Sequence, residues 1–302
     1  MSGVLVAAGF ELGAATHAGR VRTENEDDYL VLSQPESGWL LVAIADGMGG
    51  LAGGADASRA AVRALGAVCA EHGASADGEA TLREGFAAAA ARLKRIASGN
   101  ARLAELGTTL TGLLVRGDEV FVGHVGDTRC LRVRRGAMDA LTVDHALEEP
   151  RHLLTRCLGA GQDGADGDFS KVECKSGDTF VLCTDGAWSL LEATEIASEF
   201  RSGPLQAACE HLAQTALDRG APDNVTLVAV RVEPQPDAAP REVEIPTTEF
   251  RPRRRATSGA TSLGTARWPY VLFASALALA GLAWTRWQHG FDLLAAVRRW
   301  LE

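Results

Sequence analysis

Four short acidic motifs constrain this chain more than any other feature of its sequence. Two of them come after continuous apolar runs, with Asp46 after Trp39–Ala45 and Asp185 after Phe180–Thr184. Such runs are typical of buried β-strands, so these carboxylates are expected at strand ends. The four motifs are Arg22-Thr23-Glu24-Asn25-Glu26-Asp27, Asp46-Gly47-Met48-Gly49-Gly50, Thr184-Asp185-Gly186-Ala187-Trp188 and Asp223-Asn224.

Carboxylates that several strands deliver to one place repel each other unless cations lie between them. Hard divalent ions with oxygen ligands, Mg2+ or Mn2+, meet this requirement. The alternative is that the acids are turn residues, because Asp-Gly is a common turn signal. For any single motif the turn interpretation is favoured, whereas four motifs in order, with Arg22 among them, favour a metal centre.

Residues 1–233 are predicted to form one domain in which strands dominate and helices come in pairs. The expected strands are Val4–Gly13, Tyr29–Ser33, Trp39–Ala45, Thr109–Val115, Glu119–Val125, Cys130–Arg134, Phe169–Glu173, Thr179–Cys183 and Val225–Val232. The expected helices are Ala55–His72, Ala80–Ser98, Glu192–Phe200 and Leu205–Asp218. Because these helices do not alternate regularly with strands, the order fits two antiparallel sheets with helices outside them.

Further motifs accompany the first four and extend the pattern over roughly residues 10 to 232. They are Gly107-Thr108-Thr109, Val125-Gly126-Asp127-Thr128-Arg129, Leu141-Thr142-Val143-Asp144-His145, Leu154-Thr155-Arg156-Cys157-Leu158-Gly159 and Asp223-Asn224-Val225-Thr226. In this order the motifs resemble the bacterial form of the PP2C (PPM) family of metal-dependent serine/threonine protein phosphatases. The resemblance implies an α+β fold, an αββα sandwich of two antiparallel β-sheets flanked by helix pairs.

The resemblance gives five residues a role in binding Mn2+ or Mg2+, with two ions expected and a position for a third. Asp46 is the expected bridging ligand, and the carbonyl of Gly47 is a second ligand. Asp185 and Asp223 would complete the first metal, and Asp127 matches the position that can hold a third ion together with Asp185. Two ions about 3.5–4 Å apart can share a bridging water and lower its pKa towards neutrality.

Four other residues are expected to act in catalysis. Arg22 is the expected phosphate clamp, because its fork can bind two phosphoryl oxygens at once, which Lys cannot do. The alternative for Arg22 is a surface salt bridge with Glu24 or Glu26. Glu26 and Asp27 are expected to hydrogen-bond water molecules on the metals, and Asn224 to orient the neighbouring ligands.

Two features of this chain depart from patterns within the family. Met48 stands where eukaryotic members often carry a His proposed as general acid, so a metal-bound water would have to protonate the leaving oxygen. The flap segment is short, because only Ala146–Leu153 separates His145 from Leu154. His124 and His145 are interpreted as core or loop-anchoring residues.

Charge and cysteine content limit the class of partner and the compartment. Residues 1–233 carry 21 basic and 33 acidic side chains, which argues against nucleic acid as a partner because binding to its backbone relies on Lys and Arg.

None of the six cysteines forms a C-x-x-C pair, and most lie among apolar residues. Buried free thiols in a reducing compartment are therefore expected.

The C-terminal part of the chain changes character. Residues 234–267 are rich in Pro, Ser, Thr and Arg and are predicted to be a solvated linker. Residues 268–286 are predicted to be a transmembrane helix, because Trp268–Thr285 carries no charge and has aromatic residues at its ends. A buried core helix is the alternative. Residues 287–302 are predicted to be a short basic amphipathic tail, either lying flat on the membrane or solvated.

The sequence therefore predicts a single-pass enzyme of the bacterial inner membrane with its catalytic domain in the cytoplasm, since Arg251, Arg253, Arg254, Arg255 and Arg267 precede the span. Its expected partners are phosphorylated proteins and a serine/threonine kinase that it opposes. One alternative is a catalytically weak PPM-like signalling or binding module, which would be expected to lose some metal-binding acids. Another is a dedicated regulatory phosphatase that acts on one phosphorylated partner.

Overall fold

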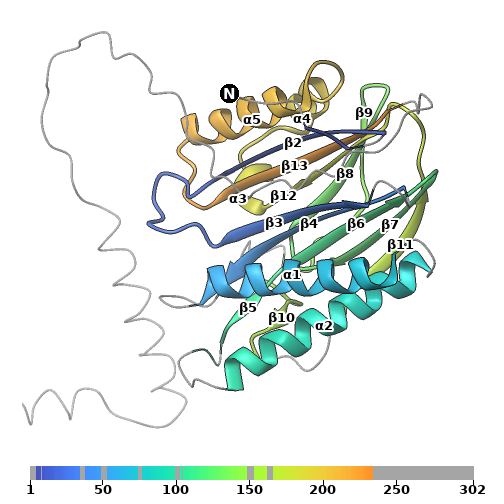
Figure 1. Cartoon of the computed structure of the whole chain (residues 1–302). Coiled ribbons are helices and arrows are strands. Elements are labelled where there is room, and N and C mark those ends of the chain that lie inside the picture. Colours follow the sequence, from blue (N-terminus) through green and yellow to red (C-terminus); the bar gives the residue numbers. More distant parts are fainter. Residues whose placement is uncertain are drawn as a thin grey trace, which may run out of the picture. The chain divides into compact units, whose positions relative to one another are not determined.

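A computed structural model describes most of the chain up to residue 233 (Figure 1). The described residues are 5–7, 9–34, 38–48, 53–73, 77–98, 103, 105–147, 153–161 and 166–233. The predicted linker at 234–267, membrane helix at 268–286 and tail at 287–302 lie outside them. Within the described part, no helix combines the length and apolar composition that crossing a membrane requires.

Two antiparallel β-sheets form the centre of the fold (Figure 1). The first sheet has the order β1 (Leu5–Ala7), β2 (Phe10–His17), β13 (Val225–Val232), β12 (Thr179–Cys183), β8 (Arg129–Arg134) and β9 (Ala137–Ala140). The second has the order β10 (Leu158–Gly159), β5 (Gly107–Thr108), β4 (Trp39–Met48), β6 (Leu110–Arg116), β7 (Glu119–Val125) and β11 (Asp168–Glu173), and β3 (Asp27–Gln34) also pairs with β4.

The apolar run of β4 is continuous because both faces of its sheet are buried. Leu40 and Ile44 point into the core between the two sheets, where they join Phe180 of β12. Leu41 and Ala43 point the other way, into the core beneath the helices. Alternation along the strand therefore supplies both cores with apolar side chains.

Helices cover the outer face of each sheet (Figure 1). The second sheet carries α1 (Gly54–His72) and α2 (Gly78–Ser98), and the first carries α4 (Ala193–Glu199) and α5 (Leu205–Asp218). A Cβ atom at Gly85 would lie 2.3 Å from Leu65 Cδ1, so the absence of a side chain there lets α2 approach α1 closely. These layers confirm the predicted αββα sandwich.

Several elements differ from the sequence-based expectation. The single strand expected at Val4–Gly13 is two strands, because Gly9 adopts a φ of 82° and β1 folds back onto β2. β4 continues to Met48, since Gly47 and Met48 pair with β5. The short elements β5, β9, β10 and α3 (Asp185–Trp188) were not predicted, because pairing with distant segments rather than local pattern defines them.

The prediction of buried free thiols is confirmed, since all six cysteines are buried and none forms a disulfide. The acids of the predicted site lie at or beside the ends of strands. β3 begins at Asp27, whose partner in the ladder is Asp46 near the end of β4. Asp185 and Asp223 flank the paired ends of β12 and β13. Asp127 follows the end of β7, so each sheet delivers its acids at one end.

Candidate metal centre

Asp27 is a buried carboxylate held by two threonine hydroxyls from the other sheet. Its side chain is 8% exposed. Its Oδ2 atom accepts a hydrogen bond from Thr226 Oγ1 at 2.6 Å and from Thr184 Oγ1 at 3.0 Å. Its buried Oδ1 atom has no hydrogen-bond partner among the described residues. The threonines therefore fix one oxygen of Asp27 and leave the other for a further ligand.

Burial and the charges of neighbouring acids raise the pKa of Asp27 and of Asp46. Burial raises the pKa of Asp27 to about 7, the threonine hydrogen bonds oppose this shift, and the charges of Asp185 and Asp223 add to it. Burial likewise raises the pKa of Asp46 well above its usual value, and the charges of Asp27, Asp185, Asp127 and Asp223 raise it further. The charges of four aspartates thus act on Asp46, although these residues come from both sheets.

The loop of Asp127 is fixed by residues far along the chain. Burial and the charge of Asp185 raise the pKa of Asp127 to about 7. The backbone carbonyl of Asp127 accepts a hydrogen bond from Trp188 Nε1 at 2.9 Å. The amide of Gly126, at a φ of 106°, donates to His145 Nδ1 at 3.2 Å, and the His145 amide donates to the Gly126 carbonyl at 2.7 Å. His145 therefore anchors the loop, as expected from the sequence.

Asp185 is the first residue of α3, directly after β12. The next residue, Gly186, packs against the backbone of the Asp223-Asn224 loop. A Cβ atom at Gly186 would lie 1.9 Å from the carbonyl oxygen of Asn224, so only glycine fits there. This close approach holds the turn after β12 against the turn before β13.

Arg22 lies beside the acids on an exposed loop. Its Nη2 atom donates to Asp223 Oδ2 at 2.8 Å, and half of its side chain is exposed. The expected alternative was an ion pair with Glu24 or Glu26, whereas the direct partner in the structure is Asp223. The guanidinium therefore keeps an exposed surface next to the acid cluster.

Asn224 holds the loop that carries Arg22. Its Nδ2 atom donates to the carbonyls of Ala18 and Glu24, both at 2.9 Å, and its Oδ1 atom accepts from the amide of Glu26 at 2.9 Å. The Asn224 side chain thus fixes the backbone from Ala18 to Glu26, and its backbone amide donates to Asp223 Oδ1 at 2.9 Å.

Gly47 and Glu26 meet the first turn of α1. The Gly47 amide donates to the carbonyl of Glu26 at 3.1 Å. A Cβ atom at Gly47 would lie 2.0 Å from the carbonyl oxygen of Gly54, and one at Gly54 would lie 2.2 Å from Glu26 Oε1. Burial raises the pKa of Glu26, and the charge of Arg22 opposes that shift. The two glycines therefore allow Glu26, β4 and α1 to converge.

The comparison with protein families agrees with this arrangement, because the family described as Protein phosphatase 2C matches residues 16–221. This chain belongs to the protein phosphatase 2C family. The serine/threonine protein phosphatase PstP of Mycobacterium tuberculosis is 28% identical over 239 residues, which cover 72% of this chain and 44% of PstP. Protein phosphatase PhpP of Streptococcus pneumoniae is 29% identical over 242 residues, which cover 73% of this chain and 96% of PhpP. The match therefore spans less than half of PstP and nearly all of PhpP.

Solved structures of the protein phosphatase 2C family share the fold. The crystal structure of PstP from M. tuberculosis has a TM-score of 0.67 and 27% identity, covering 74% of this chain and 99% of that one. PppA is described as a key regulatory component of the type VI secretion system in Pseudomonas aeruginosa. Its structure has a TM-score of 0.65 and 30% identity, covering 74% of this chain and 98% of PppA. The structure of the PstP catalytic domain in complex with two manganese ions has a TM-score of 0.67 and 28% identity, covering 74% of this chain and 99% of that domain.

The donor set of this phosphatase 2C domain fits divalent cations. Its acids offer hard oxygen ligands, and buried Asp27 beside them keeps an unsatisfied Oδ1 atom that can accept a hydrogen bond from water at the site. In the described part of the chain, no three His, Cys, Asp or Glu side chains are gathered tightly enough to form a finished metal cage. The raised pKa values of Asp27 and Asp46 reflect burial and repulsion among these acids, which a bound cation would offset.

Sequence reasoning missed the roles of Thr184, Thr226 and Trp188. Both threonines lie inside motifs already singled out, one beside Asp185 and the other just after Asn224. The signal available in the sequence was that each threonine lies close to a predicted metal ligand. No local pattern could show that both would reach Asp27, because 157 and 199 residues separate them from it.

Proposed function

We propose that this protein is a metal-dependent serine/threonine protein phosphatase that hydrolyses phosphoserine and phosphothreonine on proteins. The observation that carries the proposal is that the charges of Asp27, Asp127, Asp185 and Asp223 act on Asp46, beside the half-exposed Arg22 that pairs with Asp223. The activities named for PstP and PhpP support it.

The residues that would hold Mn2+ or Mg2+ are Asp46, Asp127, Asp185, Asp223 and the carbonyl of Gly47. Bound divalent ions would neutralise phosphoryl oxygens and lower the pKa of water, which is the chemistry that phosphomonoester hydrolysis needs. The PstP structure with two manganese ions supports this choice of cofactor. In this proposal Asp46 would serve as a ligand to two ions, and Asp127 with Asp185 would hold a third.

The remaining site residues act on substrate and on loop geometry. Arg22 would bind two phosphoryl oxygens through the exposed edge of its guanidinium and orient the phosphate. Asn224 would keep Arg22 in reach by holding the loop from Ala18 to Glu26. Asp27 and Glu26 would accept hydrogen bonds from water at the site, with the threonine pair fixing Asp27. Met48 offers no proton, so a water molecule at the site would protonate the leaving oxygen.

The test is hydrolysis of a phosphothreonine peptide by the purified full chain, with Mn2+, with Mg2+ and with chelator. We expect turnover with either ion and none in chelator. A chelated protein that keeps its full activity would contradict the metal-dependent mechanism. Binding of the phosphopeptide without turnover in saturating Mn2+ would instead favour a catalytically weak binding module.

We also propose that residues 268–286 anchor the enzyme in the inner membrane with the catalytic domain in the cytoplasm, where it would oppose a serine/threonine kinase. The support comes from the sequence, since Trp268–Thr285 is uncharged and arginines precede it. Full-length protein is expected in the membrane fraction after alkaline washing, and a chain truncated after residue 239 in the soluble fraction. Full-length protein that washes off would contradict the anchor.

A further inference from the structure

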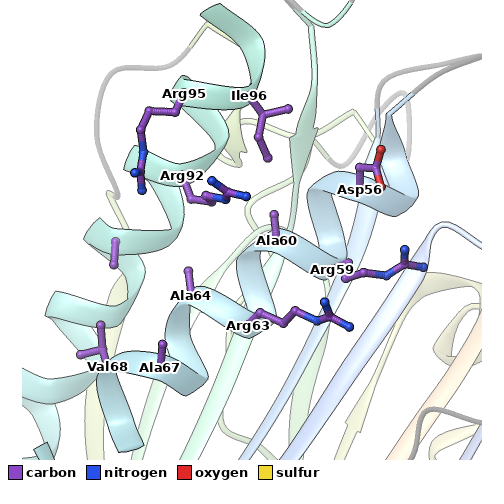
Figure 2. Close-up of a pocket in the computed structure, with 11 residues that line it drawn as sticks. Asp56, Arg59, Ala60, Arg63, Ala64, Ala67, Val68, Arg92, Arg95 and Ile96 are labelled. Carbon is purple, nitrogen blue, oxygen red and sulfur yellow. The ribbon is translucent and has the colours of Figure 1, made fainter. Parts of the chain in front are cut away.

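A groove of about 620 Å³ runs between α1 and α2 (Figure 2). Its lining comes entirely from these two helices. The lining residues are Asp56, Arg59, Ala60, Arg63, Ala64, Ala67, Val68, Ala88, Arg92, Arg95 and Ile96. None of them belongs to the candidate metal centre, so the groove is a separate feature of the molecule.

The floor of the groove consists of small apolar side chains. Ala60, Ala64 and Ala67 follow one another along one face of α1, and Ala88 faces them from α2. These alanines are half-buried or exposed, whereas Ala61 and Leu65 on the opposite face of α1 are fully buried against the sheet. The floor therefore presents apolar surface that would allow another segment to approach the helix backbones closely.

The rim of the groove is strongly basic. Arg59 and Arg63 extend from α1, Arg92 and Arg95 extend from α2, and Ala60 and Ala64 lie between the two helices (Figure 2). All four arginines are exposed. Asp56 is the single acid in the lining and lies at one end of it.

Few of these positive charges are neutralised within the domain. Arg59 reaches Asp28 only at 3.7 Å, and Arg95 donates a long hydrogen bond of 3.4 Å to the carbonyl of Ala91. Neither Arg63 nor Arg92 forms an ion pair with any residue that the structure describes. Because the 1–233 region as a whole is acidic, this rim is a local reversal of charge that would attract an anionic partner.

We propose that this groove is a docking site for an acidic amphipathic helix of a partner protein. The lining of α1 spans Asp56 to Val68, about 18 Å at roughly 1.5 Å per residue, which matches about three turns of a bound helix. Apolar side chains of that helix would lie on the alanine floor, and its carboxylates would pair with the arginines. A flat anionic membrane fits less well, because the apolar floor lies below the charged rim.

The probe for this proposal is a fluorescein-labelled helical peptide with leucines along one face and glutamates on both sides. A peptide of the same pattern with lysine in place of glutamate is the control. We expect the full chain to bind the acidic peptide at least tenfold more tightly in fluorescence anisotropy. Arg63→Glu/Arg92→Glu should weaken this binding at least tenfold. Arg135→Glu/Arg201→Glu makes the same change of charge on exposed residues outside the groove and should leave it unchanged.

A second pair of variants tests the groove rather than its charge. Ala67→Trp would fill the floor, whereas Ala87→Trp places the same ring on an exposed residue of α2 outside the lining. Only the first should weaken binding, and both should keep the melting temperature and phosphatase activity of the parent chain. Equal binding of both peptides, or no effect of Ala67→Trp, would overturn the proposal. Displacement of the peptide by phosphatidylglycerol vesicles would assign the arginines to a membrane surface instead.

Discussion

Arg22 Nη2 donates a hydrogen bond to Asp223 Oδ2 over 2.8 Å, which joins the expected phosphate-binding residue to an expected metal ligand. The remaining exposed half of the Arg22 side chain is available to a substrate oxygen. A phosphate bound there would therefore share Arg22 with Asp223, and the two roles of the residue can be separated by measuring substrate turnover and metal affinity independently.

Arg22→Ala is expected to lower kcat/KM for a phosphothreonine peptide roughly 30- to 150-fold, which corresponds to the loss of about 2–3 kcal/mol from a charged hydrogen bond. The affinity for Mn2+ should stay equal or rise, because removing a cation leaves Asp223 free for the metal. Steady-state kinetics and calorimetric titration with Mn2+ check the two parts. Arg20→Ala, at a neighbouring exposed arginine that lies 3.9 Å from Asp218, is the control and should change neither. Lost metal binding in Arg22→Ala would make Arg22 a structural residue.

Asp46→Asn should abolish most activity yet stabilise the metal-free protein. The substitution removes the expected bridging charge, so both ions should bind more weakly and activity should fall at least ~100-fold. It also removes a partly buried carboxylate whose pKa is raised by desolvation and by four other acids, which relieves repulsion in chelator. Thermal melting in chelator and turnover in saturating Mn2+ provide the measurements. Near-normal turnover of Asp46→Asn would refute the assignment.

The chelated protein should lose stability as the pH rises from about 4 to about 7. Asp27 and Asp127 each have a folded-state pKa of about 7, above the value of 3.8 expected for an unfolded chain. Between these values the folded state binds more protons than the unfolded state, so the free energy of unfolding falls with rising pH. Melting temperatures in chelator at pH 5 and pH 8 test this expectation. Saturating Mn2+ should remove most of the difference in melting temperature between the two pH values. A chelated protein that is more stable at pH 8 than at pH 5 would contradict the prediction.

Asn224→Asp should loosen the Arg22 loop while preserving most of the shape of the side chain. The carboxylate still accepts a hydrogen bond from Glu26, but it cannot donate to the carbonyls of Ala18 and Glu24 and adds another negative charge. We expect faster amide hydrogen exchange in residues 18–26 and a fall in kcat/KM of at least ~10-fold, since the two lost hydrogen bonds contribute about 1 kcal/mol each. Unchanged exchange in this loop would show that other contacts hold it.

The sequence alone predicted much of the sandwich and the identity of the acids. Continuous apolar runs such as Trp39–Ala45 indicated strands buried on both faces, and the αββα arrangement followed from their order together with the family resemblance. Placing Asp27, Asp46 and Asp185 near strand ends was also possible, because an acid next to an apolar run is a local signal.

Tertiary structure decided how these residues meet. The threonine pair that binds Asp27, the contact between Arg22 and Asp223, and the packing of Gly186 on Asn224 all join segments far apart in the chain. Local pattern carries no information on such contacts, because they depend on the register and packing of both sheets. The same reason explains the groove between α1 and α2, since the sequence predicted these helices as a pair but not the register that places their arginines along one groove.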